Sequence, residues 1–326
     1  MRYTIFGESH GPAIGVTLTG VPSGVEIDMD FILSEMARRR PGQNALSTAR
    51  NEADIPEILS GVFEGKTTGT PLCAIIRNND TRSKDYSQLK ICPRPSHGDY
   101  AGSIRYEGCN DYRGGGHFSG RLTAPLVFAG AVAKLILKAS CGGMVTSRIS
   151  MLEGVINPTA EQVEQIVLAA KADQDSVGGA IACEVTGLPA GFGAPDFGCN
   201  VEGIFSQHLF AVPAVKAVAF GAGFGFAAMR GSQANDPFYM DNGQVKTRTN
   251  HAGGINGGIT NGMPITFEVA IRPTPSISKE QDTVNLATGE NTKLVIDGRH
   301  DPCIVHRALP VIEAAAALAA CEVLGI

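Results

Sequence analysis

Two stretches of this chain repeat each other, and this repeat constrains the fold more than any other feature. Residues 14–24 read IGVTLTGVPSG and residues 181–191 read IACEVTGLPAG. A second motif recurs with identical spacing: Gly61, Gly65, Thr67, Gly69 and Pro71 in one copy, and Gly254, Gly258, Thr260, Gly262 and Pro264 in the other. Duplicated strand–turn–helix–strand units predict a single domain, 1–326, built from two similar halves (roughly 1–150 and 151–326) with pseudo-two-fold symmetry.

Hydrophobic spacing predicts helices and strands between these motifs. Asp30 is expected to cap a helix that runs through Met36 and ends before Pro41. Further helices are predicted at 124–139, 160–172 and 309–324, and strands at 3–6, 14–19, 57–63, 71–76, 180–186, 215–220, 265–271 and 293–296. The resulting class is α+β, with β-α-β layers in one compact unit.

Charge and cysteine content narrow the location and the partners. The 326 residues carry 27 basic and 32 acidic side chains, a net charge of −5, which argues against binding to nucleic acid or an anionic membrane. Eight cysteines without a CxxC pair indicate reduced thiols and no structural metal site. No signal peptide is evident, and no apolar run reaches the roughly 18 residues of a membrane span, 311–324 being the nearest. We therefore expect a soluble, cytoplasmic protein.

Two glycine-rich segments look like nucleotide-binding motifs but lack the required spacing. Residues 61–67, GVFEGKT, have one residue too few between the glycines for a P-loop. Residues 221–225, GAGFG, lack the last glycine of a dinucleotide-binding fingerprint. A kinase, an NTPase or a dinucleotide-binding domain is therefore disfavoured.

The segment Glu8-Ser9-His10, between two glycines and directly after a short apolar strand, is suited to anion binding and proton donation. Glycine lets the backbone approach a ligand, and histidine changes charge near neutral pH. Four further segments combine arginine or histidine with glycine or proline, and a fifth holds histidine in a glycine run: 38–43 (RRRPGQ), 93–100 (PRPSHGDY), 112–121 (YRGGGHFSGR), 298–303 (GRHDPC) and 250–258 (NHAGGINGG). A single histidine is more often structural, but the number of such segments favours a site for an anionic ligand.

These residues resemble chorismate synthase over essentially the whole chain. Its three signature regions stand here as GESHGPAIGVTLTGVP (7–22), GHFSGRLTAPLVFAGAV (116–132) and RHDPC (299–303), and MRGSQANDPF (229–238) and RPTPSI (272–277) agree as well. The resemblance implies a β-α-β sandwich with internal pseudo-symmetry, usually a homotetramer. It also implies a carbon–oxygen lyase that eliminates phosphate from 5-enolpyruvylshikimate 3-phosphate to give chorismate, with reduced FMN and no net redox change.

The resemblance assigns roles to individual residues. His10 would be the general acid at the phosphate, His97 would protonate or stabilise the reduced flavin, and Asp301 would assist proton removal through the flavin. Substrate contacts are expected at Ser9, Arg39, Arg94, Arg121 and Arg299. Flavin contacts are expected at His117, Phe118, Ser119, Gly257, Arg272, Pro273, Thr274, Pro275, Ser276 and Arg299.

Three positions depart from the usual family pattern. Ala45 and His117 stand where many members have arginine, and Arg272 stands where lysine is common. At Ala45 one anion contact is either lost or supplied from elsewhere. His117 is expected to replace the contact of that arginine with the flavin, less strongly when the imidazole is neutral, and Arg272 keeps the positive charge.

Two other interpretations stay open beside this one. An ordinary flavin oxidoreductase would transfer a hydride and reoxidise its flavin during turnover. A non-catalytic protein that binds flavin or anions would have lost some of His10, His97 and Asp301, and all three are present. The source of reducing equivalents is also open: NADPH could reduce the flavin on this chain, but a separate flavin reductase is favoured.

Overall fold

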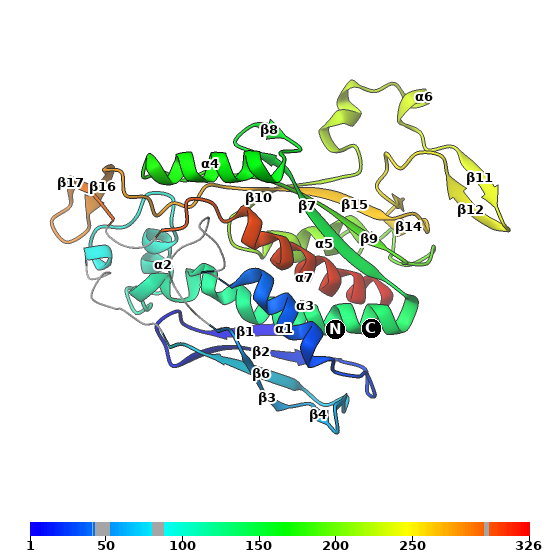
Figure 1. Cartoon of the computed structure of the whole chain (residues 1–326), viewed down its shortest axis with the longest axis horizontal. Coiled ribbons are helices and arrows are strands. Elements are labelled where there is room, and N and C mark those ends of the chain that lie inside the picture. The colour runs from blue at the N-terminus through cyan, green and yellow to red at the C-terminus, as the bar shows by residue number, and fades with distance from the viewer. Residues whose placement is uncertain (41, 43–52, 80–87, 297–299) are drawn as a thin grey trace.

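The computed structural model describes residues 1–40, 42, 53–79, 88–296 and 300–326. Two antiparallel sheets enclose a layer of helices (Figure 1). The first sheet has the order β1-β2-β6-β3, and the second has the order β10-β15-β9-β7-β8. Both sheets and the helices between them share one hydrophobic core, which runs from Ile14 to Val323. The predicted β-α-β sandwich is therefore confirmed.

The first sheet is formed by the N-terminal part of the chain. Its strands are β1 (Arg2–Gly7), β2 (Ala13–Thr19), β3 (Pro56–Ser60) and β6 (Leu72–Arg77). Ile14, Val16 and Leu18 alternate with smaller or polar residues along β2 and are fully buried against the helices. A short hairpin of β4 (Val62–Phe63) and β5 (Lys66–Thr67) lies between β3 and β6 in sequence.

The second sheet repeats this arrangement. Its strands are β7 (Met144–Leu152), β8 (Val155–Ile156), β9 (Gly179–Thr186), β10 (Val215–Phe220) and β15 (Ile265–Ile271). The hairpin of β13 (Ile255–Asn256) and β14 (Ile259–Thr260) corresponds to β4–β5. Without β8, the order β7-β9-β15-β10 corresponds strand for strand to β1-β2-β6-β3.

Equivalent hydrogen bonds confirm the repeat that the sequence predicts. Thr67 Oγ1 donates to the Pro22 carbonyl at 2.6 Å, and Thr260 Oγ1 donates to the Pro189 carbonyl at 2.7 Å. Each threonine oxygen also accepts from a backbone amide three residues after that proline, at 2.9 Å and 3.0 Å. In both halves, the Thr-Gly-apolar-Pro turn is therefore held by hydrogen bonds to the hairpin threonine, Thr67 in the first half and Thr260 in the second.

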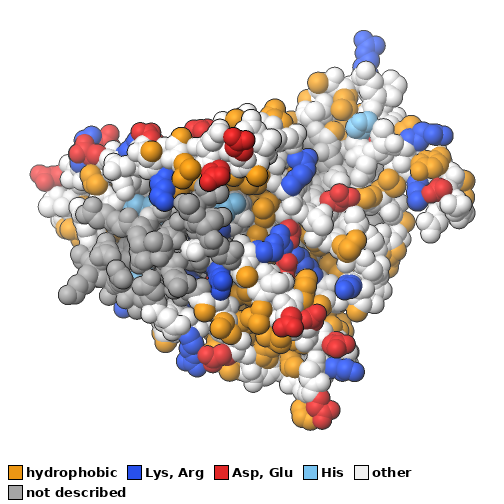
Figure 2. All heavy atoms as spheres, in the orientation of Figure 1, with side chains coloured by type: hydrophobic (Ala, Val, Ile, Leu, Met, Phe, Trp, Pro, Cys, Tyr) orange, Lys and Arg blue, Asp and Glu red, His pale blue; other side chains and the backbone are white. Residues whose placement is uncertain are grey.

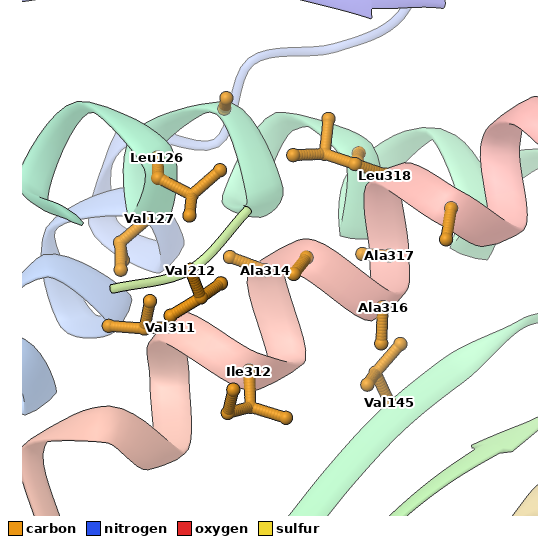
Figure 3. Packing of buried hydrophobic residues seen from close by; sticks show 14 of the residues in the cluster. Leu126, Val127, Val145, Val212, Val311, Ile312, Ala314, Ala316, Ala317 and Leu318 are labelled. Carbon is orange, nitrogen blue, oxygen red and sulfur yellow. The ribbon is translucent and has the colours of Figure 1, made fainter. Parts of the chain in front are cut away.

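Four helices fill the space between the sheets: α1 (Met29–Arg39), α3 (Thr123–Cys141), α5 (Val201–Phe210) and α7 (Val305–Leu324). Helices α3 and α7 pack closely because Gly130 faces Ala314; a β-carbon on Gly130 would lie 2.1 Å from that of Ala314. Figure 3 shows Leu126 and Val127 of α3 beside Ala314 of α7. Small residues at this crossing let the two backbones approach each other.

A cluster of charged residues joins α1, α3 and α7 within this layer. Arg38 donates two hydrogen bonds to Glu313, at 2.6 and 2.7 Å, and Lys134 also bonds Glu313 at 2.6 Å. Glu35 pairs with both cations, and Ser147 of β7 donates to Glu313. Burial would raise the pKa of Glu313, but these hydrogen bonds hold it below its ordinary value.

The remaining elements lie outside the sandwich. They are α2 (Asp99–Arg105), α4 (Ala160–Ala172), α6 (Gly231–Ala234), the hairpins β11–β12 (Phe238–Asp241, Gln244–Thr247) and β16–β17 (Gln281–Asn285, Glu290–Leu294), and the 3-10 helices Arg113–Phe118, Gly120–Leu122 and Gly223–Ala228. The β11–β12 hairpin projects from one end of the molecule, and α2 and the β16–β17 hairpin lie at the other (Figure 1).

Several predicted boundaries are wrong for identifiable reasons. Asp28, not Asp30, caps α1, because its carboxylate accepts from the Phe31 amide at 2.9 Å. Helix α7 begins at Val305, one turn before the predicted start, and Pro310 lies inside it. The predicted strand 57–63 is two strands separated at Gly61, whose φ of +83° breaks the ladder. The predicted strand 293–296 is β17, which ends at Leu294.

One helical segment, 120–141, is long and apolar enough to cross a membrane by length and composition alone. It is a different segment from 311–324, which the sequence suggests as the nearest candidate. Of its apolar window, 72% is buried inside the structure. Its packing is that of a core helix.

Candidate active site

The loop 7–11 and the glycine run 114–116 lie directly against each other. The Ser9 amide donates to the Gly116 carbonyl at 3.2 Å. All three glycines have positive φ (58°, 82° and 54°), and a β-carbon on Gly114 would lie 2.2 Å from the His10 ring. Only glycine fits this turn, because other residues are strained at these angles and would displace His10.

His10 and Ser9 are held in a buried polar setting. His10 is 8% exposed and Ser9 is fully buried. The Ser9 hydroxyl has no hydrogen-bond partner among the described residues, and a β-carbon on Gly114 would lie 3.0 Å from it. A buried hydroxyl without a partner is costly, which indicates that a ligand uses it. Nearby, burial raises the pKa of Glu8, with His117 opposing and Asp111 reinforcing the rise.

The glycine turn also reaches the segment 94–99. A β-carbon on Gly115 would lie 3.3 Å from His97 Cε1 and 3.5 Å from Arg94 Nη2. Arg94 pairs with Asp99 through two hydrogen bonds of 2.7 and 2.8 Å, and His97 Nδ1 lies 2.6 Å from Asp99. The structure therefore brings His10, His97 and Arg94 together around one turn.

Arg39 and Arg121 converge on a buried carboxylate. Both are nearly inaccessible, with exposures of 2% and 5%. Arg121 Nη1 bonds Asp54, and Arg39 Nη2 lies 3.6 Å from the other oxygen of Asp54. Two guanidinium groups therefore share one carboxylate, and guanidinium groups are the side chains best suited to bind carboxylate and phosphate anions.

Asn78 ties this cluster to the loop 7–11. Arg121 Nε donates to Asn78 Oδ1 at 3.0 Å. The Asn78 amide in turn donates to the carbonyls of Glu8 and Gly11, at 3.0 and 2.9 Å. The end of β6 thereby fixes the distance between Arg121 and the loop that carries His10.

Asp301 reaches the site through Arg307. Arg307 Nη1 bonds the Asp301 carboxylate, and its Nε donates to the Arg39 carbonyl at 2.9 Å. This contact places Asp301 at the C-terminal end of α1. Arg299 and Ala45, both singled out in the sequence, lie outside the described residues.

The segment 272–276 packs against the segment that carries Arg94 and His97. Arg272 Nη1 donates to the Ser96 carbonyl at 2.5 Å, and Arg94 Nη1 donates to Ser276 Oγ at 3.0 Å. The Thr274 hydroxyl is buried and has no partner among the described residues. Pro273 and Pro275 stand between these residues and limit the flexibility of the segment.

His117, Phe118 and Ser119 follow the glycine run. His117 Nδ1 lies 3.0 Å from the Gly7 carbonyl; because a carbonyl only accepts, that nitrogen carries a proton. The Phe118 ring packs on Gly98 and Gly102 at the start of α2. Ser119 Oγ accepts from the Arg121 amide at 3.3 Å.

Gly257 is the exception among the predicted site residues. It lies between β13 and β14, and Figure 1 places β14 near the end of the molecule opposite α2. Within one chain it is therefore not brought together with His10 and His97.

Sequence reasoning did not identify Asp54, Asn78, Asp99 and Arg307 as site residues. Only Asp99 had a visible signal, because it stands in the same turn segment as Arg94 and His97. The other three are distant in sequence from their partners, so that only the fold brings them into contact.

The comparisons with known proteins agree with one another. The family model described as chorismate synthase matches residues 1–324. Chorismate synthase from Chitinophaga pinensis is 46% identical over 318 residues, covering 98% of this chain and 92% of that protein. The protein of the same name from Methanothermobacter thermautotrophicus is 45% identical over 340 residues, covering 97% and 90%.

A solved structure gives the same result at the level of the fold. A crystal structure of chorismate synthase superposes with a TM-score of 0.77 at 26% identity, covering 99% of this chain and 91% of the other. The signature segments, the fold and these relatives lead to one conclusion: the chain belongs to the chorismate synthase family.

Proposed function

We propose that this chain eliminates phosphate from 5-enolpyruvylshikimate 3-phosphate to give chorismate, in a site formed by the residues described above. The observation that carries the proposal is that one glycine turn, 114–116, touches both His10 and His97. The substrate has two carboxylates and a phosphate, and Arg39 and Arg121 supply positive charge beside this turn.

Each group has a defined task in this proposal. His10 donates a proton to the departing phosphate, and the Ser9 hydroxyl donates a hydrogen bond to the same substrate. Arg39 and Arg121 orient the substrate anions, and Arg94 and Arg299 make further contacts with the substrate. Asp301 assists removal of the substrate proton. Arg307 orients the Asp301 carboxylate through the bond between them.

The residues present suit reduced FMN. Arg272 supplies positive charge, and the hydroxyls of Thr274 and Ser276 can donate to the cofactor phosphate. Ser276 accepts from Arg94, which leaves its own proton available, and Thr274 has no partner among the described residues. When bound, reduced FMN supplies the electron density that eases loss of phosphate. His97, His117, Phe118 and Ser119 would contact it beside the glycine turn, with Pro273 and Pro275 shaping its phosphate site.

The proposal extends to the assembly. We propose a homotetramer, supported by exposed apolar side chains on the projecting hairpin: Phe238, Met240 and Val245 are 65%, 66% and 58% exposed. Figure 2 shows hydrophobic side chains gathered at this end of the visible face. Gly257 could contribute to a flavin site only from another copy.

We also propose a cytoplasmic location and a flavin that is reduced by a separate reductase rather than by NADPH on this chain. The location is supported by eight cysteines, all described, none of which forms a disulfide. Basic and acidic groups are mixed over the face in Figure 2, which supports a small-molecule substrate rather than nucleic acid.

Substitution of the two histidines tests the assignment of the site. His10→Ala and His97→Ala should fold and bind FMN but lose roughly 10²–10⁴-fold in turnover, the usual scale for acid–base groups. His208→Gln is the control, because His208 is as buried as His10 (7% and 8% exposed) but bonds Glu322 and Tyr3 instead of lying against the glycine turn. Near-normal turnover in both site variants would refute the assignment.

A further inference from the structure

We propose that Asn78 is a positioning residue, which holds the turn that presents Ser9 and His10 and links this turn to Arg121. The inference deepens the proposed function and rests on it, since it uses the roles given there to His10 and Arg121. It gives a task in the reaction to a residue that the sequence motifs do not include.

The segment 8–11 is a tight turn with Ser9 and His10 at its centre. The Gly11 amide donates to the Glu8 carbonyl at 3.0 Å, which closes the turn. The Ser9 amide donates to the Gly116 carbonyl at 3.2 Å, which fixes the turn to the glycine run. One closing bond leaves a turn open to local motion, so further contacts decide how precisely the two side chains are held.

The register of the first sheet places Asn78 beside this turn. Strands β2 and β6 pair Ala13 with Arg77, so the residue after β6 lies beside the residue before β2. The backbone amide of Asn78 accordingly donates to the Pro12 carbonyl at 3.2 Å. Side chains alternate along β6, and Ile76 is buried in the core, so the Asn78 side chain two residues later points to the same face.

The side-chain amide of Asn78 uses both its nitrogen and its oxygen. Nδ2 donates to the carbonyls of Glu8 and Gly11, at 3.0 and 2.9 Å, which are the two ends of the turn. Oδ1 accepts from Arg121 Nε at 3.0 Å. A carbonyl only accepts and a guanidinium only donates, so a single orientation of the amide satisfies all three partners. Asn78 therefore bridges both ends of the turn and faces Arg121 at the same time.

The bond to Arg121 joins two tasks of the site. Arg121 is 5% exposed and bonds Asp54 as well as Asn78. In the proposed reaction its guanidinium orients a substrate anion, while His10 protonates the departing phosphate. Because Asn78 bonds both Arg121 and the turn that carries His10, a displacement of either one moves the other. Asn78 thereby sets the position of the proton donor relative to the bound substrate.

Asn78→Asp separates the two links. The new carboxylate still accepts from Arg121, but it has no N–H for the carbonyls of Glu8 and Gly11 and repels them. We expect kcat to fall by about 10²-fold, because His10 is displaced. KM for 5-enolpyruvylshikimate 3-phosphate should change by less than about threefold, because Arg121 is still held. A residue that only stabilised the fold would not divide kcat from KM in this way.

Hydrogen–deuterium exchange gives a readout that is independent of turnover. Mass spectrometry of the full chain, without substrate, should show the amides of 8–11 exchanging roughly tenfold faster or more in Asn78→Asp than in the wild type. Asn157→Asp is the matched control, because the Asn157 oxygen also accepts from an arginine, Arg148, but lies directly after β8 and outside the site. It should leave kcat, KM and this exchange unchanged.

Normal kcat in Asn78→Asp would overturn the inference, even if the turn exchanges faster. So would a loss of kcat without faster exchange at 8–11, or a rise in KM alone. If the carboxylate prevents folding, Asn78→Ala removes both links without adding charge; its kcat should fall and its KM should rise, and normal values would overturn the inference equally. Normal turnover in His10→Ala would instead refute the proposed role of His10 itself.

Discussion

At the scale of single residues, the site depends on positions where no side chain is tolerated. Gly114 has a φ of +58°, and its hypothetical β-carbon overlaps the His10 ring. The glycine run was visible in the sequence as an anion-binding candidate. In the structure the glycine run does something other than bind an anion directly: it allows His10 and His97, which come from separate loops, to approach the same turn.

Replacement of Gly114 should therefore damage the site more than the fold. Gly114→Ala must move His10, and we expect turnover to fall by about 10²-fold or more while the circular dichroism spectrum is retained. Gly108→Ala is the control, since Gly108 has a φ of +74° with open space around it and bears only the backbone strain. Equal loss of turnover in both variants would show that strain, not the position of His10, is responsible.

The sequence identified His10, His97 and the arginines but not the acidic residues that orient them. Arginine, histidine and glycine have recognisable chemistry in a short segment, whereas an aspartate gains its role from its neighbours in space. Asp54 meets Arg39 and Arg121 only because α1, the start of the next strand and the lead-in to α3 fold together.

At the scale of elements, the charged cluster between α1, α3 and α7 is the least expected part of the core. Glu313 is 2% exposed and bonds Arg38, Lys134 and Ser147. In the sequence it appeared only as an interruption in an alanine-rich helix. A buried ion is tolerated when its partners satisfy it, and removal of one partner leaves the others uncompensated.

Glu313→Leu should therefore lower the free energy of unfolding by about 3–5 kcal/mol at pH 7, measured by urea denaturation. The folded-state pKa of Glu313 lies below its ordinary value, so its contribution is present above that value and is lost as pH falls through the folded pKa. The gap between wild type and variant should narrow in acid. Glu164→Gln, at an exposed position of α4, should change stability by less than about 0.5 kcal/mol. A gap that widens in acid would contradict the assigned role.

The sequence predicts elements with a long, regular hydrophobic pattern correctly, but it predicts the residues at which elements begin and end less well. The predicted strands at 215–220 and 265–271 and the helix at 160–172 coincide with β10, β15 and α4. Helix α5 and strand β7 were missed. Pro310 obscured the true start of α7, because proline usually marks the first turn of a helix.

At the scale of the whole molecule, the two repeats share one core. Helix α3 follows the first sheet and helix α7 follows the second, yet the two pack against each other at Gly130 and Ala314. The first residue and the last are also joined, since the N-terminal amine donates to the Ile326 carbonyl at 2.8 Å. The repeat was readable from the sequence, but this packing of one half against the other was not.

If the chain is a single domain, as we propose, it should unfold as one unit. We expect one transition in differential scanning calorimetry, with fluorescence of the six tyrosines and circular dichroism melting together. Light scattering on the folded sample should give four times the 34.1 kDa chain if the proposed homotetramer forms. Two separate transitions would contradict the single-domain prediction, and a monomer mass would refute the assembly without affecting the fold.

The central claim is a phosphate elimination that leaves the flavin reduced, and anaerobic turnover of 5-enolpyruvylshikimate 3-phosphate with chemically reduced FMN tests it most directly. Chorismate and phosphate would be followed together with the flavin spectrum. We predict equal release of both products with the flavin still reduced at the end. Oxidation of the flavin in proportion to product would instead indicate hydride transfer, and tight binding of flavin and substrate without any product would indicate a binding protein that has lost the chemistry.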